Sequence, residues 1–370
     1  MLNLTVDNWQ YLHGEPLVKA TLKQELSDFQ VNEILSFEPS GNGEHTFLHI
    51  EKTGLNTAFV AEEIAKFAKI PLRAVSYAGR KDKYATTSQW FGVYFGGKQH
   101  ASRKSSVVKP ADIDWSALQI EGLRILNVTY NDKKLRLGAI KENQFTIVLR
   151  NMSEFDHNAL NERIALIEQK GVPNYFGNQR FGELIKADGS VQLGGNLALA
   201  EKLVNGEDIR NRNKKSMAVS ALRSWLFNHF VSYRLANTQY MQVFDGDVLS
   251  LSGSNSFFIH EQNSEQSEET LKRLNLRDVN ITAPLWGKGK LDAKAQALVF
   301  EHEKALEHEA VCEALVNLGL EQQRRPILVF PKNLSFEVFE NTLTLKFSLP
   351  SGCFATSVIR EIAEVSTGKR

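Results

Sequence analysis

Segments in which apolar and polar residues alternate, as they do in β-strands, lie toward both ends of the chain. Residues 29–34 and 144–150 show this pattern in the first part, and residues 342–347 show it in the last part. Between them, residues 219–235 space their apolar side chains for one face of a helix. This order predicts a sheet domain that is interrupted by an inserted, helix-rich domain.

The same patterns predict the other elements. A helix is expected to begin at Asn56 or Thr57, to bury Phe59 and Val60, and to end before Pro71. We further predict strands over 46–51, 90–95, 123–128 and 326–330, helices over 154–169, 293–318 and 357–365, and an exposed loop or helix start at 261–269.

The composition is that of an ordinary soluble globular protein, with 42% hydrophobic and 24% charged residues among 370. The formal net charge is only +1, so a nucleic-acid partner would have to be bound by a local basic patch. Cys312 and Cys353 are too distant in sequence for a metal knuckle and indicate a reducing compartment. Since neither a leader-like start nor a membrane-spanning apolar stretch is present, a cytoplasmic location is expected.

Several familiar catalytic fingerprints are missing from the sequence. It contains no GxxxxGK[ST], no GxGxxG between a strand and a helix, no GxSxG and no HExxH. His302 and His308 are six residues apart, do not share a helix face and are predicted to lie on a solvated surface. The chemistry of an enzyme with this sequence is therefore expected to be that of an isomerase or a simple hydrolase.

The segment 78–89 carries the strongest chemical signal. Asp82 stands among three cations, Arg80, Lys81 and Lys83, between a predicted helix and an aromatic-rich strand. Nearby opposite charges favour the ionised form of a carboxylate and lower its pKa. Such a group suits nucleophilic attack or electrostatic stabilisation. The same cations would attract a polyanion, although a solvated charged turn is the simpler interpretation.

Basic residues gather in other segments as well. Lys23 precedes the Ser-Asp-Phe segment at 27–29, just ahead of a predicted strand. Cations interleaved with apolar residues, or clustered at a helix start, fit contacts to a phosphate backbone. A charged hairpin tip and a solvated helix face are the alternatives. The residues concerned are Lys133, Lys134 and Arg136 in the first part, then Arg210, Arg212, Lys214 and Lys215, with Lys98, Arg103, Lys104 and Lys109 as a further stretch.

Residues 174–182 combine two glycines, three amides, Arg180 and three aromatic residues. That mixture is unusual for a core segment. It predicts a loop that stacks on an exposed base and hydrogen-bonds to it, with an ordinary turn as the alternative. Together, the basic and aromatic segments favour a folded RNA as the partner rather than a small metabolite.

Five motifs now make a family resemblance recognisable. AGRKDKYATTSQW, KLRLGAIKENQFTIVLR, GVPNYFGNQRFG, RNRNKKS and SLPSGCFATSVIRE, in this order, resemble the TruD family of tRNA pseudouridine synthases. The resemblance implies an α+β fold: a pseudouridine synthase core with a mixed, largely antiparallel sheet and flanking helices, plus a large inserted α/β domain. The catalytic domain would comprise residues 1–170 and 329–370, and the inserted domain residues 171–328.

The resemblance also implies an activity and a site. The family isomerises the uridine at tRNA position 13, in the D arm, without a cofactor, so the expected partner is tRNA. No membrane partner is expected, and the oligomeric state stays open with a monomer as the default. Asp82 resembles the catalytic aspartate, and Lys23 a lysine that pairs with it. Residues that resemble the lining of the uridine pocket are Phe29, Asn143, Phe145 and Phe354. Lys81, Lys83, Arg180 and the basic residues at 133–136 and 210–215 are predicted to contact RNA.

The mechanism and two rival functions stay open at this point. Asp82 could attack the anomeric carbon or remove the C2′ proton, and the sequence does not separate these routes. One rival is a non-catalytic protein that binds or remodels tRNA. The other is a hydrolase of glycosides or nucleosides that would need a second carboxylate, for which Glu33 and Glu183 are candidates.

Overall fold

A computed structural model describes residues 4–6, 9–96, 113–185, 191–237, 240–254 and 256–368. The basic residues Lys98, Arg103, Lys104 and Lys109 lie outside these ranges. Within them, every helix is too short or too polar to cross a lipid bilayer.

The chain divides into two compact units. The first, which we call the sheet unit, contains Pro16–Ile164, Pro331–Ala355 and Ile362–Arg370. The second, the helix-rich unit, contains Met1–Glu15, Ala165–Phe330 and Thr356–Glu361. The first 15 residues and a short segment after residue 355 group with the helix-rich unit.

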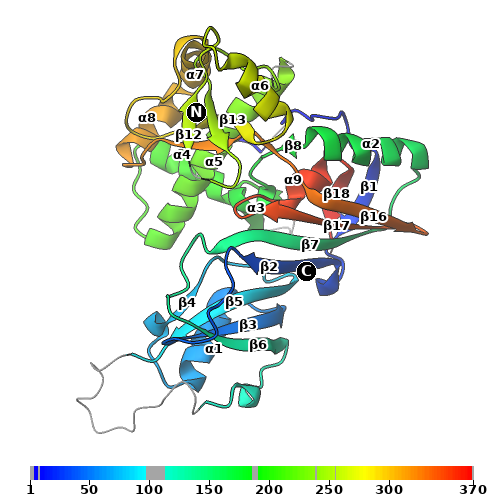
Figure 1. The fold of residues 1–370 in the computed structure, drawn as a ribbon, viewed down its shortest axis with the longest axis vertical. Coiled ribbons are helices and arrows are strands. Elements are labelled where there is room, and N and C mark those ends of the chain that lie inside the picture. Colours follow the sequence, from blue (N-terminus) through cyan, green and yellow to red (C-terminus); the bar gives the residue numbers. More distant parts are fainter. Residues whose placement is uncertain are drawn as a thin grey trace. The chain divides into compact units, whose positions relative to one another are not determined.

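The sheet unit is built on a mixed sheet whose central strands follow the order β16-β17-β7-β2-β5-β3-β6 (Figure 1). In that order the strands are Lys332–Phe339, Thr342–Pro350, Ile140–Arg150, Phe29–Leu35, Thr86–Tyr94, His45–Thr53 and Leu123–Asn131. Of these neighbouring pairs, β2 and β5 are parallel and the others antiparallel. A mixed α+β fold with a large mixed sheet is therefore confirmed.

Three further strands complete this sheet. β4 (Val75–Tyr77) pairs with β5, and β1 (Val18–Leu22) pairs with β7 and, in parallel, with β18 (Ala363–Thr367). The prediction of a final helix over 357–365 is wrong in its second half. Helix α9 spans only Ala355–Arg360, because the following residues pair with the edge of β1 and gain its hydrogen bonds.

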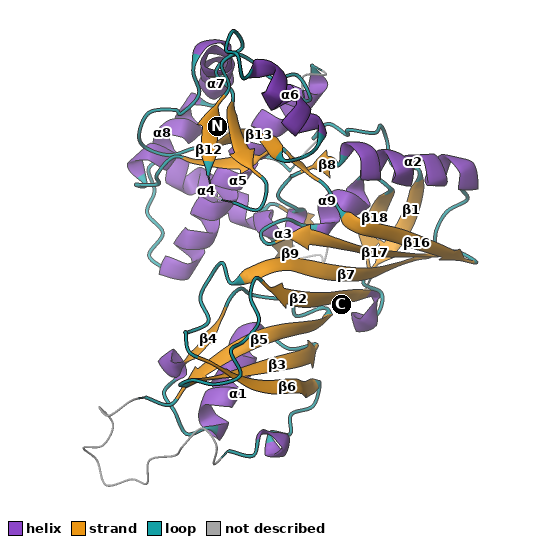
Figure 2. Ribbon diagram, in the orientation of Figure 1, coloured by secondary structure: helices purple, strands orange, loops and turns teal. Residues whose placement is uncertain are grey.

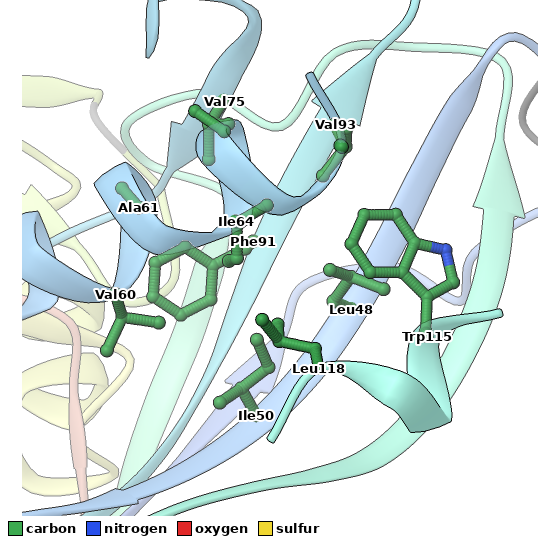
Figure 3. Packing of buried hydrophobic residues seen from close by; sticks show 12 residues of the cluster. Leu48, Ile50, Val60, Ala61, Ile64, Val75, Phe91, Val93, Trp115 and Leu118 are labelled. Atoms are coloured by element: carbon green, nitrogen blue, oxygen red, sulfur yellow. The ribbon is translucent and has the colours of Figure 1, made fainter. Parts of the chain in front are cut away.

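Helix α1 (Thr57–Phe67) covers part of one face of the sheet, as Figure 3 shows. Val60 and Ile64 of α1 lie in one buried cluster with Ile50 of β3 and Phe91 of β5. Phe59, predicted to belong to the buried face, is 40% exposed instead. The helix therefore presents a narrower apolar stripe to the sheet than the pattern predicts.

The helix-rich unit contains more strand than the sequence pattern predicts (Figure 2). Its antiparallel sheet has the order β12 (Phe257–Ile259), β11 (Val248–Leu251), β13 (Val279–Leu285), β14 (Gln323–Pro326). Two short pairs join β8 (Val172–Pro173) to β15 (Leu328–Val329) and β9 (Glu183–Ile185) to β10 (Val191–Leu193). The helices are α2 (His157–Lys170), α3 (Asn178–Phe181), α4 (Gly195–Val204), α5 (Arg212–Ala236), α6 (Ser267–Asn275), α7 (Ala295–Leu306) and α8 (Glu309–Asn317), the first of which begins in the sheet unit.

The single helix predicted over 293–318 is in fact two helices, α7 and α8. The helix is interrupted at Glu307 and His308, and His308 has non-helical dihedral angles. The spacing of His302 and His308 predicted a solvated surface, but His308 packs against other rings instead. Its ring lies 4.3 Å from that of His229 and 5.0 Å from that of Trp225, so tertiary contacts at this residue accompany the break.

Candidate active site

Asp82 lies in the loop of residues 78–85 that connects β4 to β5. Ala78 and Ala85 are buried at the two ends of this loop, which anchors it to the sheet. The Asp82 Oδ1 atom accepts a 3.0 Å hydrogen bond from the main-chain N of Tyr84, and Oδ2 forms an ion pair with Lys23 Nζ. Since the Asp82 side chain is still 16% exposed, a substrate atom can reach the carboxylate.

Lys23 is held in place by its own segment of chain. It follows β1 directly and has a φ of 57°, a left-handed conformation that costs a non-glycine residue about 1–2 kcal/mol. The buried Asp28 fixes the turn that follows, because its carboxylate accepts hydrogen bonds from Glu25 N at 2.8 Å and Arg150 Nε at 2.9 Å. Strain of this kind, maintained by surrounding contacts, is typical of functional sites.

Aromatic rings adjoin the Lys23–Asp82 pair. Lys23 Nζ lies 4.3 Å from the centre of the Phe29 ring. The Phe29 ring meets Phe145 edge-on at 6.2 Å, and Phe145 stacks on Phe347 at 5.4 Å. The structure thus joins Lys23, Phe29, Asp82 and Phe145 in one chain of contacts. Phe347 is absent from the sequence-based site, although the alternating pattern of 342–347 placed it on a strand.

Asn143 and Phe354 are the remaining residues predicted for the pocket. Asn143 lies on β7, opposite Glu33 of β2 and Leu349 of β17. Its Oδ1 atom is buried and accepts no hydrogen bond from the residues that the structure describes. A buried acceptor without a donor is costly, so this atom is suited to bind a donor of a ligand. Phe354, in the chain segment that links β17 to α9, is half-buried, and its place in the pocket stays a prediction.

Glu33 and Lys81 form a second ion pair beside the loop. The Glu33 carboxylate is also bonded by the main-chain N of Trp90 at 2.9 Å, and its side chain is fully buried. Burial raises the pKa of Glu33, and the Lys81 ammonium opposes that shift. Lys81 was predicted to contact RNA, but its side chain is only 11% exposed and its ammonium points to Glu33. Lys83, by contrast, is exposed.

The loop between β6 and β7 carries the first basic cluster. Lys133, Lys134 and Arg136 are exposed, whereas Leu135 between them is buried against Phe47 and Ile140. The buried leucine anchors the loop, and the cations around it remain in solvent. This arrangement is compatible with phosphate contacts, which stay a prediction.

The basic residues of the helix-rich unit differ in their solvent exposure and in their side-chain partners. Arg210, Arg212 and Lys214 are exposed around the start of α5, and Lys215 forms a 2.8 Å ion pair with Asp208. Arg180 is half-buried and donates to Ser220 Oγ at 2.8 Å. Burial lowers the pKa of Arg180, although an arginine remains charged.

The interpretation of residues 174–182 as a base-stacking loop is wrong for its aromatic rings. Tyr175, Phe176 and Phe181 are all buried. Phe176 packs edge-on against Phe227 of α5 at 5.6 Å, and its main-chain N donates to Asn228 Oδ1. These rings are therefore part of the core of the helix-rich unit. The buried amide of Asn228 satisfies the main-chain N and O of Phe176.

A cavity of about 200 Å³ lies elsewhere in the helix-rich unit. Its lining includes His229, Tyr233, Lys304 and His308, and none of the residues predicted for the site lines it. Burial lowers the pKa of His229 to about 3 and also lowers that of His308. Both imidazoles are therefore neutral at physiological pH.

Comparison with known proteins adds to this geometry. The family model described as "tRNA pseudouridine synthase D (TruD)" matches residues 5–191 and 200–362. The chain belongs to the TruD family. Two proteins named tRNA pseudouridine synthase D are similar over nearly their whole length. The one from Pseudoalteromonas atlantica is 48% identical over 98% of each chain, and the one from Shewanella oneidensis is 44% identical over 96% of this chain and 88% of that one.

A solved structure supports the TruD fold. The crystal structure of the putative tRNA pseudouridine synthase D (TruD) from Methanosarcina mazei superposes with a TM-score of 0.67 and covers 95% of both chains. The two sequences are only 20% identical, so this likeness concerns the fold alone.

Proposed function

We propose that this protein isomerises the uridine at position 13 in the D arm of tRNA to pseudouridine, with Asp82 as the catalytic group and no cofactor. The observation that carries the proposal is the similarity to proteins named tRNA pseudouridine synthase D, which extends over nearly the full chain. The geometry supports it independently, because an accessible carboxylate stands beside a lysine and an aromatic cluster.

The proposed reaction is an isomerisation and needs no co-reactant. The bond between C1′ and N1 of the uridine breaks, and a bond between C1′ and C5 forms. The proton lost from C5 is balanced by the proton gained at N1. Asp82 either attacks C1′ or removes the C2′ proton, and in both routes the Lys23 ammonium balances the charge of the carboxylate before reaction.

The residues around Asp82 suit the handling of a detached base. Phe29 and Phe145 offer apolar surface that would confine the ring, and Phe354 is proposed to do the same. The unpaired Oδ1 of Asn143 would accept a hydrogen bond from the N3–H of uracil. Flipping the base out of the tRNA costs a few kcal/mol. Phosphate contacts by the exposed basic residues would offset this cost.

The finer assignments are part of the same proposal. Residues 1–170 and 329–370 would form the catalytic pseudouridine synthase domain, and residues 171–328 the inserted domain. The protein would act as a cytoplasmic monomer. Of the two carboxylates considered for a hydrolase, Glu33 is buried and paired with Lys81 and so is not free to act in catalysis. The side chain of Glu183 lies outside the part of the structure that is described.

The test compares wild-type protein with Asp82→Asn and with the control Asp292→Asn, which changes an exposed aspartate of the helix-rich unit. Modified uridines are mapped at nucleotide resolution in treated tRNA. Wild type and the control should modify one uridine of the D arm. Asp82→Asn should be slower by on the order of 10⁴-fold and should still bind tRNA.

Each other outcome has a definite meaning. Turnover of Asp82→Asn near the wild-type rate would refute Asp82 as the catalytic group. If wild type binds tRNA and forms no pseudouridine, the non-catalytic rival is correct. Release of free uracil would instead indicate a hydrolase.

A further inference from the structure

Lys52 is a buried cation directly beneath the candidate nucleophile. It lies near the end of β3 and is 0% exposed. Its Nζ atom donates to the main-chain oxygen of Asp82 at 2.8 Å and to that of Leu55 at 2.7 Å. Nothing in the local sequence singles out Lys52, since a Glu-Lys pair at the end of a strand is typical of solvent exposure.

An ammonium in this position is expensive to bury. Leu48 and Ile50, which precede Lys52 in the same buried row of β3, are apolar and pack under α1 (Figure 3). Burial lowers the pKa of Lys52 to about 8, and attraction by Asp82 opposes that shift. No carboxylate of the described residues lies within ion-pair distance of its Nζ. An apolar side chain would fill this row at less cost, so packing alone does not account for a lysine.

The neighbouring residue of the loop is held just as firmly. The main-chain N of Lys81 donates to Thr57 Oγ1 at 3.0 Å, and Thr57 donates in turn to Gln89 Oε1 at 2.8 Å. The Lys81 side chain is paired with the buried Glu33. The main chain of residues 81–82 is therefore attached to α1 through Thr57 and to β3 through Lys52. Only the side chain of Asp82 projects toward Lys23.

We propose that Lys52 is a positioning residue for the reaction: by bonding the main-chain oxygen of Asp82, it fixes the distance between the reactive carboxylate and the bound nucleotide. Lys23 contacts the carboxylate itself, whereas Lys52 acts through the backbone behind it. The proposal rests on the proposed function, in which Asp82 is the catalytic group. Displacement of a reacting group by about 1 Å can cost about 10²-fold in rate.

The test is a single-turnover assay of Lys52→Met with Lys66→Met as control. Lys66 lies on α1 in the same unit, and its side chain is 70% exposed. The amplitude of the assay reports the fraction of active enzyme, and the rate constant reports catalysis by that fraction. Lys52→Met should lower the rate constant about 10²-fold and leave its Kd for tRNA within twofold of wild type. For Lys66→Met, both the rate constant and the Kd should stay within twofold of wild type.

A purely structural role gives a different result. It would lower the amplitude and leave the rate constant of the remaining active enzyme unchanged, and this outcome would overturn the proposal. Should Lys52→Met fail to fold, Lys52→Gln is the second variant, because its amide is one bond shorter and cannot reach both oxygens. A wild-type rate constant in that variant would also overturn the proposal. Absence of pseudouridine with wild-type enzyme would instead reject the proposed function itself.

Discussion

Both units contain an aspartate paired with a cation, but the two pairs are built differently. In the helix-rich unit, Arg234 donates to both oxygens of Asp247, at 2.9 and 2.6 Å, and Phe244 N donates at 2.7 Å. These side chains are only 4% and 1% exposed. In the sheet unit, the Asp82 carboxylate pairs with the ammonium of Lys23 and accepts from Tyr84 N at 3.0 Å, and the side chains of Asp82 and Lys23 are 16% and 14% exposed.

The difference separates a structural carboxylate from a reactive one. The planar guanidinium of Arg234 binds both oxygens of Asp247 in a fixed geometry, and burial keeps a ligand from reaching them. A lysine is a point charge that leaves more of the carboxylate accessible. An aspartate paired with a cation therefore serves folding in one unit and, by our proposal, chemistry in the other.

The largest expected contrast is in stability. Asp247→Asn should lower the free energy of unfolding by about 3–5 kcal/mol, because it leaves the buried Arg234 charge without its partner. Asp82→Asn should cost clearly less, since solvent reaches both members of its ion pair. Urea unfolding followed by circular dichroism measures both. Equal losses of unfolding free energy in the two variants would show that the Asp82 pair is as structural as the Asp247 pair.

The pH dependence of stability tests the buried cation behind Asp82. Burial lowers the pKa of Lys52 from 10.5 to about 8, with Asp82 raising it and Lys81 lowering it further. Between these values the unfolded chain holds a proton that the folded protein has lost, so stability rises with pH. The unfolding free energy of wild type minus that of Lys52→Met should increase by up to about 3 kcal/mol from pH 8 to 10.5. A flat difference would show that Lys52 is not desolvated.

The smallest effect concerns exposed charges of the helix-rich unit. Lys214 and Lys215 lie in the first turn of α5, where the positive end of the helix dipole repels cations and favours an anionic partner. Replacing both with Gln should weaken tRNA binding and reduce the slope of log K against log salt by about 1–2. The control is Lys272→Gln, an exposed lysine of α6. An unchanged slope would place the RNA contacts elsewhere.

Most of the sheet unit could be predicted because its strands carry a clear alternating pattern and its helix α1 a clear periodicity. The local sequence patterns predicted the wrong secondary structure where contacts with residues distant in sequence are involved. Residues 363–367 form a strand because β1 provides an edge, and the break at His308 accompanies contacts with the rings of His229 and Trp225. Neither partner is visible in the local sequence.

The sequence by itself determined the family, the charged loop around Asp82 and the pairing expected with Lys23, because motif residues keep their order and spacing along the chain. Only the tertiary structure decided which charges are buried. It turned Lys81 toward Glu33, placed the rings of Tyr175 and Phe176 in a core, and brought the main chain of Asp82 over Lys52. Burial depends on what the rest of the chain lays over a residue, and a local pattern does not contain that information.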